Sequence, residues 1–387
     1  MRRVYLDSNS TTRLDPKVLQ AMLPYLQEHF GNPSNLHSFG REVKEGLERA
    51  RQEVAEFLGC SSPEIIFTSS GTESDNLALI GTYLTYGEKR NHLIISAIEH
   101  NAVRKAAYFL KKTHNITLTE LPVDRYGQVN PEDLKKVIND QTYLVSIMYV
   151  NNEVGTIQPI KECARIAHQH GALFHTDAVA AAGKLSINVK ELDVDLLTIS
   201  AHKIHGPKGV GALYVRRGIQ IANILHGGEQ EHERRPGTEN VPGIIGFGVA
   251  VKIAREELAQ GMPQKIESLR NYLENQIVNN ISEIYLNGHP QNRVCNVLNI
   301  GFAYIEGEAL LLNLDLEGIA VSSGSACSSG SGQPSHVLLA MRVPLKYINA
   351  PVRFSLDKYT TKEELDYTVE VLIKVVNRLR AISPLGA

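Results

Sequence analysis

Residues 195–212 read DLLTISAHKIHGPKGVGA, and this stretch decides the fold. Its first part is apolar from Leu196 to Ile199, and the short apolar run indicates a buried strand. Lys203 follows the strand directly, and a glycine-rich turn follows Lys203. Ligands of α/β folds bind just beyond the carboxyl ends of strands. Partial desolvation there favours the neutral lysine amine that forms Schiff bases. An ordinary surface loop is the alternative, and the rest of the chain decides between the two.

Short apolar runs alternate with helical patterns from residue 65 onward, which predicts an α/β fold with a mainly parallel sheet covered by helices on both faces. We expect a large domain at residues 15–258, built on seven strands. Residues 259–387 predict a smaller α+β domain, and residues 1–14 are expected to join it. The predicted strands are residues 65–68, 93–96, 116–121, 143–150, 172–176, 195–200 and 211–215.

Composition narrows the function classes. The chain has 387 residues, of which 43% are hydrophobic and 21% charged, as in soluble globular proteins. Its net charge of −2 gives no basic field for nucleic acid. No apolar stretch approaches the ~20 residues that span a bilayer, and the N-terminus has no secretory pattern. We therefore expect neither a nucleic-acid nor a membrane partner.

The cysteines are few and far apart. Cys60, Cys163, Cys295 and Cys327 form no Cys-x-x-Cys pair, so the sequence indicates neither a zinc site nor a disulfide framework. A reducing, cytoplasmic setting fits this pattern best.

Residues 68–76, TSSGTESDN, follow a predicted strand and open a helix. Backbone N–H groups at a helix start, together with the Thr72 hydroxyl, form an anion site. An ordinary capping box of Ser70 and Glu73 is the alternative. Both interpretations can hold, because a cap and a phosphate site use the same donors.

Three more polar side chains lie at predicted strand ends. His100 is placed to lie flat against an aromatic ring, or to cap a helix. Asn152 is placed to bind a substrate carboxylate or a ring oxygen, or to form a turn. Asp177 is placed to hold a pyridinium N–H, as the electron sink of pyridoxal chemistry requires, or to cap a helix.

Ser200 and His202 flank Lys203, where they can donate hydrogen bonds to a phosphate. Arg353 lies in a late apolar strand, and a substrate carboxylate and a structural salt bridge are equally good partners for it. Cys327 lies in a loop of small residues, 321–332, that we expect to be mobile and to expose the thiol. An incidental cysteine in a linker is the alternative. Together these residues describe pyridoxal-phosphate chemistry on an amino acid, with a thiol that accepts what is removed.

With these residues in place, the chain closely resembles the cysteine desulfurases of the NifS/IscS group, which are class V aminotransferases with the type I fold of pyridoxal-phosphate enzymes. The resemblance runs nearly end to end, and the joint match is very specific. The shared motifs are YLDSNSTT (5–12), GNPS (31–34), GTES (71–74), EH (99–100), NNE (151–153), SAHK (200–203), GPKGVG (206–211), RPGTEN (235–240), SSGSAC (322–327) and RFS (353–355).

The resemblance implies a role for each site residue. Lys203 would bond the cofactor and move protons, His100 would stack on its ring, and Cys327 would attack the sulfur of L-cysteine, leaving a persulfide and alanine. Asn152 and Arg353 would hold the substrate carboxylate. The implied residues of the pyridoxal 5'-phosphate site are Gly71, Thr72, His100, Asn152, Asp177, Ser200, His202, Lys203 and, from the second subunit, Thr238.

The resemblance also implies partners. The enzyme would be a homodimer with shared active sites, and its sulfur would pass to an iron–sulfur scaffold or another acceptor protein. It implies no resident metal, although Cys327 would transiently ligate an iron–sulfur cluster together with the scaffold.

Three positions depart from the family pattern. Ala180 stands where a glutamine is usual, Pro236 replaces a commoner serine or alanine, and Asn349 stands where a histidine is frequent. Pro236 also occurs in selenocysteine lyases, which makes such a lyase the nearest alternative. Ala180 motivates a second alternative, a weakly active or non-catalytic homologue. An aminotransferase is a poorer alternative, because it would need no loop cysteine.

Overall fold

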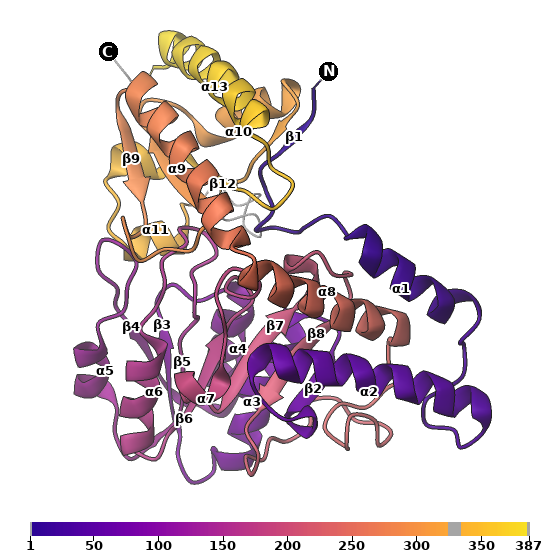
Figure 1. Ribbon diagram of the computed structural model, residues 1–387. Helices are drawn as coiled ribbons and strands as arrows, with labels where there is room; N and C mark the ends of the chain where they lie inside the picture. The colour runs from indigo at the N-terminus through magenta and orange to yellow at the C-terminus, as the bar shows by residue number, and fades with distance from the viewer. Residues whose placement is uncertain (1, 324–333, 385–387) are drawn as a thin grey trace.

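The computed structural model describes residues 2–323 and 334–384, and a seven-stranded sheet forms the centre of its larger part (Figure 1). Neighbouring strands are parallel except at β8, which is antiparallel to both of its neighbours, so the predicted mainly parallel sheet is confirmed. The strands in order across the sheet are β2 (Ile65–Thr68), β8 (Gly211–Val215), β7 (Leu196–Ser200), β6 (Leu173–Asp177), β5 (Thr142–Ser146), β3 (His92–Ser96) and β4 (Thr117–Leu121).

Both faces of this sheet are buried, because successive side chains of a strand point to opposite faces. In β2, Ile66 packs in one apolar cluster, whereas Ile65 and Phe67 pack in the other. Helices α3 (Gly71–Tyr86) and α4 (Asn101–His114) cover the face of Ile66. The helices on the opposite face are α2 (Ser38–Leu58), α5 (Pro131–Val137), α6 (Ile160–Gln169), α7 (Val189–Leu192) and α8 (Val241–Ala259).

Helix ends follow the local sequence. Asp15 caps α1 (Pro16–Gln27) by accepting a hydrogen bond from the Lys17 N–H at 2.9 Å. Gly59 ends α2 in the left-handed conformation, with φ of 73°, which glycine adopts without steric cost. Both ends agree with the sequence prediction.

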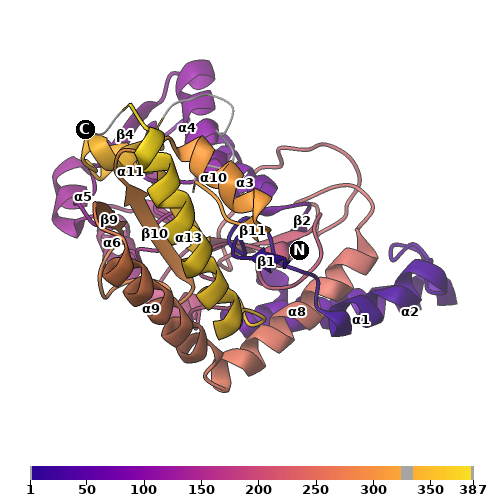
Figure 2. The ribbon, with the colours of Figure 1, turned by 90° about the horizontal axis from the view of Figure 1, so that it is seen from above.

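The smaller part is a second, antiparallel sheet of β12 (Pro351–Ser355), β10 (Val297–Phe302) and β9 (Ile284–Asn287). Seen from above, α9 (Met262–Asn280) and α13 (Lys362–Ile382) lie side by side over it (Figure 2). The remaining elements are α10 (Gly307–Leu316), α11 (His336–Ala340), α12 (Leu345–Ile348), the 3-10 turns η1 (Ser62–Glu64) and η2 (Ala201–Lys203), and the parallel pair β1 (Val4–Tyr5) and β11 (Ile319–Ala320).

The two parts are joined twice. Gly261, with φ of 77°, lies between α8 and α9, and the division that we predict at residues 258–259 falls two residues before it. The N-terminal segment crosses back, because β1 pairs with β11 and Asp7 forms a bridge with Ser355 of β12. The N-terminal residues therefore lie against strands of the smaller part.

The loop of residues 226–240 is tied to the large sheet by two ion pairs. Arg51 of α2 lies 2.7 Å from Glu231, and both side chains are almost fully buried. Arg235 lies 2.7 Å from Glu73 of α3. Breaking a buried pair by removing one partner costs about 3–5 kcal/mol, so these contacts hold the loop in place.

Two details differ from the sequence prediction. The strand expected at residues 143–150 ends at Ser146, and Ile147 and Tyr149 still donate backbone hydrogen bonds to the His175 and Asp177 carbonyls without regular strand geometry. The short elements β11, α11 and α12 were not predicted, because two to five residues carry no readable periodicity. Among the described residues, no helix combines the length and apolarity needed to cross a membrane.

Candidate active site

One edge of the large sheet gathers the predicted site residues. Asp177 ends β6, Ser200 ends β7, and Lys203 closes the turn η2 just beyond it. His100 caps α4 after β3, and Gly71 opens α3 after β2. These positions meet because β2, β3, β6 and β7 run in one direction, so their carboxyl ends share an edge.

Lys203 is half-buried, and its amine donates hydrogen bonds to the backbone carbonyls of Asn9 and Ser10, the latter at 2.9 Å. Burial lowers the pKa of Lys203 to about 8, and the positive charges of Arg353 and Lys184 add to this effect. A substantial fraction of the amine is therefore neutral near physiological pH, as a nucleophile requires.

Lys184 was not predicted from the sequence, and it lies directly beside Lys203. Its amine donates to the Lys203 backbone carbonyl at 2.7 Å, and burial lowers its own pKa to about 8. Both lysines line a cavity of about 460 Å³ between the two parts, together with Asp357 and Lys358. Lys184 thus places a second cation behind the reactive amine.

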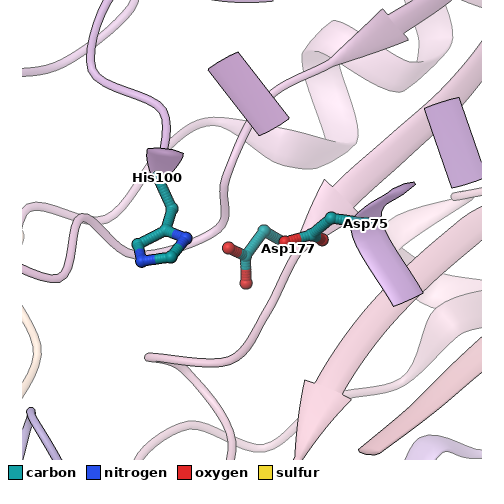
Figure 3. Close-up of side chains that lie close together, drawn as sticks. All are labelled: Asp75, His100 and Asp177. Carbon is teal, nitrogen blue, oxygen red and sulfur yellow. The ribbon is translucent and has the colours of Figure 1, made fainter. Parts of the chain in front are cut away.

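Asp177 is 5% exposed, and one of its oxygens accepts a hydrogen bond from the Val179 N–H at 2.9 Å. Burial raises its pKa, whereas His100 and Lys203 act in the opposite direction. Figure 3 shows His100, Asp177 and Asp75 gathered at this point. A pyridinium N–H beside Asp177 would stabilise the carboxylate form, so the site suits the ring nitrogen of pyridoxal phosphate.

His100 caps α4, because its Nδ1 accepts from the Ala102 N–H at 3.2 Å. The alternative of a helix cap is therefore correct. It leaves the second interpretation open, since the ring also lies beside Asp177 as stacking on a cofactor would require.

The predicted phosphate residues lie close together at the other side of the site. A Cβ atom built on Gly71 would lie 2.9 Å from the Val179 Cγ2 and 3.5 Å from the Ser200 Cβ, so only glycine fits this close approach. The Ser200 hydroxyl is buried and has no hydrogen-bond partner within the described chain. Buried hydroxyls usually have a partner, and a cofactor phosphate would supply it.

The other two predicted phosphate ligands differ in their surroundings. Thr72 is exposed on the first turn of α3. His202 contacts the Thr11 hydroxyl through Nδ1 at 3.1 Å. Burial lowers the pKa of His202 to about 4, with Lys203 as the next cause, so the ring is neutral at pH 7. It can therefore serve a phosphate as a hydrogen-bond donor but not as a cation.

Arg353 is 2% exposed in β12, and its guanidinium joins three parts of the chain. Nη2 donates to the Asp7 carboxylate and to the Ser10 hydroxyl, each at 2.7 Å, and Nη1 donates to the Asn152 carbonyl at 3.0 Å. The structural salt bridge weighed above therefore exists. The Nε atom has no partner within the described residues, and it remains for a further acceptor.

Asn152 does not follow a strand directly, because β5 ends six residues earlier. It lies in the turn after an isolated bridge between Val150 and Ile157. Its carbonyl accepts from Arg353 and from the Asn9 side chain at 2.9 Å. The structure therefore brings Asn152 to Arg353, as predicted, through its backbone.

Cys327 lies outside the described residues. The last residues described on either side are anchored next to the site. Ser322 forms a backbone bridge with Arg353, and Ser335 donates to the Glu153 carboxylate. Both ends of the undescribed segment therefore lie beside the residues predicted to hold the substrate.

Thr238 is exposed on the loop of residues 226–240, in a hollow that also includes Thr68, Ser69 and Gly209. Its assignment to the second subunit's phosphate stays a prediction. Of the departures from the family pattern, Ala180 is 8% exposed and packs in the core.

The comparisons with known proteins agree with this geometry. Residues 4–368 match the family model described as Aminotransferase class-V. The chain is 51% identical to a protein of Dictyoglomus turgidum named Cysteine desulfurase IscS, over 99% of this chain and 97% of that protein. It is 47% identical to a protein of Methanosarcina thermophila with the same name, over 99% of this chain and 94% of that protein.

Two solved structures are similar over most of the chain. One is titled NIFS-LIKE PROTEIN and has a TM-score of 0.92 and 39% identity, covering 98% of this chain and 100% of its own. The other is titled SspA in complex with cysteine and has a TM-score of 0.82 and 33% identity, covering 92% and 100%. The chain belongs to the class-V aminotransferase family and is a pyridoxal-phosphate-dependent enzyme with the fold of NifS-like proteins.

Proposed function

We propose that this protein is a cysteine desulfurase, which removes sulfur from L-cysteine and yields L-alanine and a persulfide on Cys327. The observation that carries this proposal is that one N-terminal turn, residues 7–10, contacts both the amine of Lys203 and the guanidinium of Arg353. A nucleophilic amine and a carboxylate-binding cation are thus held side by side at the site of Asp177. The printed names of the relatives and the cysteine bound in a similar structure support this substrate.

Arg353 holds the substrate carboxylate. Its Nη2 is fixed by Asp7 and Ser10, so the guanidinium plane is set before substrate arrives. Its Nε has no partner within the described chain and is free to donate to a carboxylate oxygen. Asn152 holds the Nη1 side of the group through its carbonyl.

Lys203 bonds the cofactor and then moves a proton at the substrate Cα, which the pKa of its amine near 8 permits. Bound pyridoxal phosphate supplies the electron sink for negative charge on that carbon. Asp177 holds the proton on the ring nitrogen that makes this sink effective, and Ser200 and His202 donate to the phosphate.

Cys327 accepts the sulfur. Its thiolate attacks the sulfur atom of the substrate, an S–S bond forms, and the C–S bond breaks. The electron pair of the C–S bond stays with the carbon fragment, which takes up protons and leaves as alanine. The enzyme keeps the sulfur as a persulfide, so no external oxidant or reductant is needed for this half of the reaction.

Mass spectrometry of Cys327 after exposure to cysteine tests the function directly. We expect the peptide to gain the mass of one sulfur atom, and sulfide release by Cys327→Ser to fall by orders of magnitude, because a covalent nucleophile is lost. Cofactor absorbance should persist in this variant. The matched control is Cys60→Ser, which should turn over normally. Normal sulfide production by Cys327→Ser, with no sulfur gained by the unmodified enzyme, would refute the proposal.

The relatives' names favour this activity over the selenocysteine lyase that Pro236 suggests. Ala180 predicts a slow enzyme rather than an inactive one, because Lys203, Asp177 and Cys327 are all present.

The pH dependence of cofactor capture by the apoenzyme tests the role of Lys203. Because only the neutral amine attacks, the rate of covalent capture should rise with pH and level off above about 8, where the amine is neutral. Lys184→Gln removes a nearby positive charge, so the pKa of Lys203 rises and the midpoint moves to higher pH. Stopped-flow absorbance measures both. A midpoint that Lys184→Gln leaves in place, or moves downward, contradicts the coupling of the two lysines.

The enzyme is a homodimer in this proposal. Large apolar side chains are exposed along α1 and the segment that follows it, with Leu26 at 59% and Phe30 at 75% exposure. Such a patch on a soluble enzyme usually marks an association surface. A second copy is the occupant that the site itself requires, since Thr238 of the partner subunit is expected to complete the phosphate site.

Charged substitutions on this patch test the dimer. The double variant Leu26→Glu/Phe30→Glu should sediment as a monomer and lose cofactor more readily. Leu316→Glu, an equally exposed position on α10, should leave the dimer intact. Thr238→Ala should weaken cofactor retention by about 1–2 kcal/mol, the scale of a hydrogen bond to a charged group. A monomer that retains cofactor fully would show that no site is shared.

We place the reaction in the cytoplasm, because the Cys327 thiol must be reduced before each attack. The persulfide then passes to an acceptor protein, which we take to be an iron–sulfur scaffold or a comparable sulfur carrier. Cys327 would ligate an iron–sulfur cluster only transiently, together with that scaffold.

A further inference from the structure

A second carboxyl group lies behind Asp177. Asp75, on the second turn of α3, is 1% exposed. One atom each of Asp75, Asp177 and His100 lies within 4.8 Å of the others, and Figure 3 shows the two carboxyl groups next to each other. The Asp75 Oδ1 has no hydrogen-bond partner among the described residues. Two carboxylates so close in a dry site do not both ionise.

The groups on the far side of Asp75 provide no positive charge. His175 Nε2 lies 3.7 Å from the Asp75 Oδ1 and 3.1 Å from the Thr198 hydroxyl, while its Nδ1 contacts the Ser146 hydroxyl at 2.8 Å. Burial lowers the pKa of His175 to about 3, so this ring is neutral at pH 7. An ionised Asp75 would therefore lack a cation on this side.

The remaining charged groups separate the two acids further. Asp177 and, more weakly, Glu99 raise the pKa of Asp75 beyond the effect of burial, and hydrogen bonding from Thr198 only partly opposes them. Asp177, by contrast, faces His100 and Lys203, which lower its pKa. The cations act on Asp177 and the anions act on Asp75, so a single shared proton belongs on Asp75.

We propose that Asp75 is a positioning residue that stays protonated in the holoenzyme and leaves Asp177 as the only anion facing the cofactor's ring nitrogen. This inference rests on the proposed pyridoxal-phosphate site. It adds a reason for the placement of Asp75 on α3, the same helix whose first residue lies at the phosphate end. One helix thus contributes to both ends of the cofactor site.

Infrared difference spectroscopy of the resting holoenzyme tests the protonation state. We expect a carboxylic-acid C=O band at neutral pH that is absent from Asp75→Asn. Glu99, whose pKa burial raises to about 8, should contribute a separate band. The control Glu99→Gln should remove that band and leave the one from Asp75. A spectrum of Asp75→Asn that still contains every acid band of the unmodified enzyme would overturn the proposal.

A pH titration of the cofactor absorbance provides a readout that a merely structural role would not predict. If Asp75 is neutral, Asp75→Asn conserves charge, and the titration midpoint should move by less than about threefold in proton concentration. An ionised Asp75 at this distance would move the midpoint by at least about tenfold when removed. A shift of that size contradicts the proposal.

Two further features keep the test decisive. If Asp75→Asn fails to retain cofactor, the double variant Glu99→Gln/Glu153→Gln removes the other two buried carboxyl groups whose pKa burial raises nearby. The Asp75 band must then persist, and its loss would overturn the proposal. Both measurements use resting enzyme, so they are independent of cysteine turnover, and a failure of the proposed function would appear only in sulfide release.

Discussion

Burial of like charges at one edge of the large sheet is the constraint on which the site depends. Lys203 lies near Arg353 and Lys184, and Asp177 lies near Asp75. In water these groups would all be charged, whereas in a dry site each cation lowers the pKa of its neighbouring cation and each anion raises that of its neighbouring anion. The same crowding therefore yields a neutral nucleophilic amine and a single carboxylate, which are the two states that pyridoxal chemistry requires.

The N-terminal turn makes this arrangement depend on the docking of the two parts of the chain. Asn9 and Ser10 accept from Lys203, which follows a strand of the large sheet, and Asp7 accepts from Arg353, which lies in the smaller sheet. If the parts separated, both cations would lose their partners at once. The residues that bind amine and carboxylate are thus held in register by a segment that itself does no chemistry.

Much of the fold could be predicted because buried strands leave clear apolar runs, and Lys203, Asp177 and Ser200 could be predicted because they follow such runs directly. Asp75 could not, because it lies inside a motif that already explains itself as a helix cap, and its burial depends on Asp177, about a hundred residues later. The ion pair of Asp7 and Arg353 joins positions 346 residues apart, which no local pattern reveals. Asn152 was placed near a strand end because the apolar run continues beyond the point where regular pairing stops.

Two lysines with similar pKa values lie side by side at the centre of this account, and only one of them can bond the cofactor. The most direct test is borohydride reduction of the holoenzyme followed by peptide mapping of the pyridoxyl label. The account predicts the label on Lys203 alone, because its amine lies at the edge where Asp177 and Ser200 meet. Label on Lys184, or on the nearby Lys208, would contradict the assignment of the site.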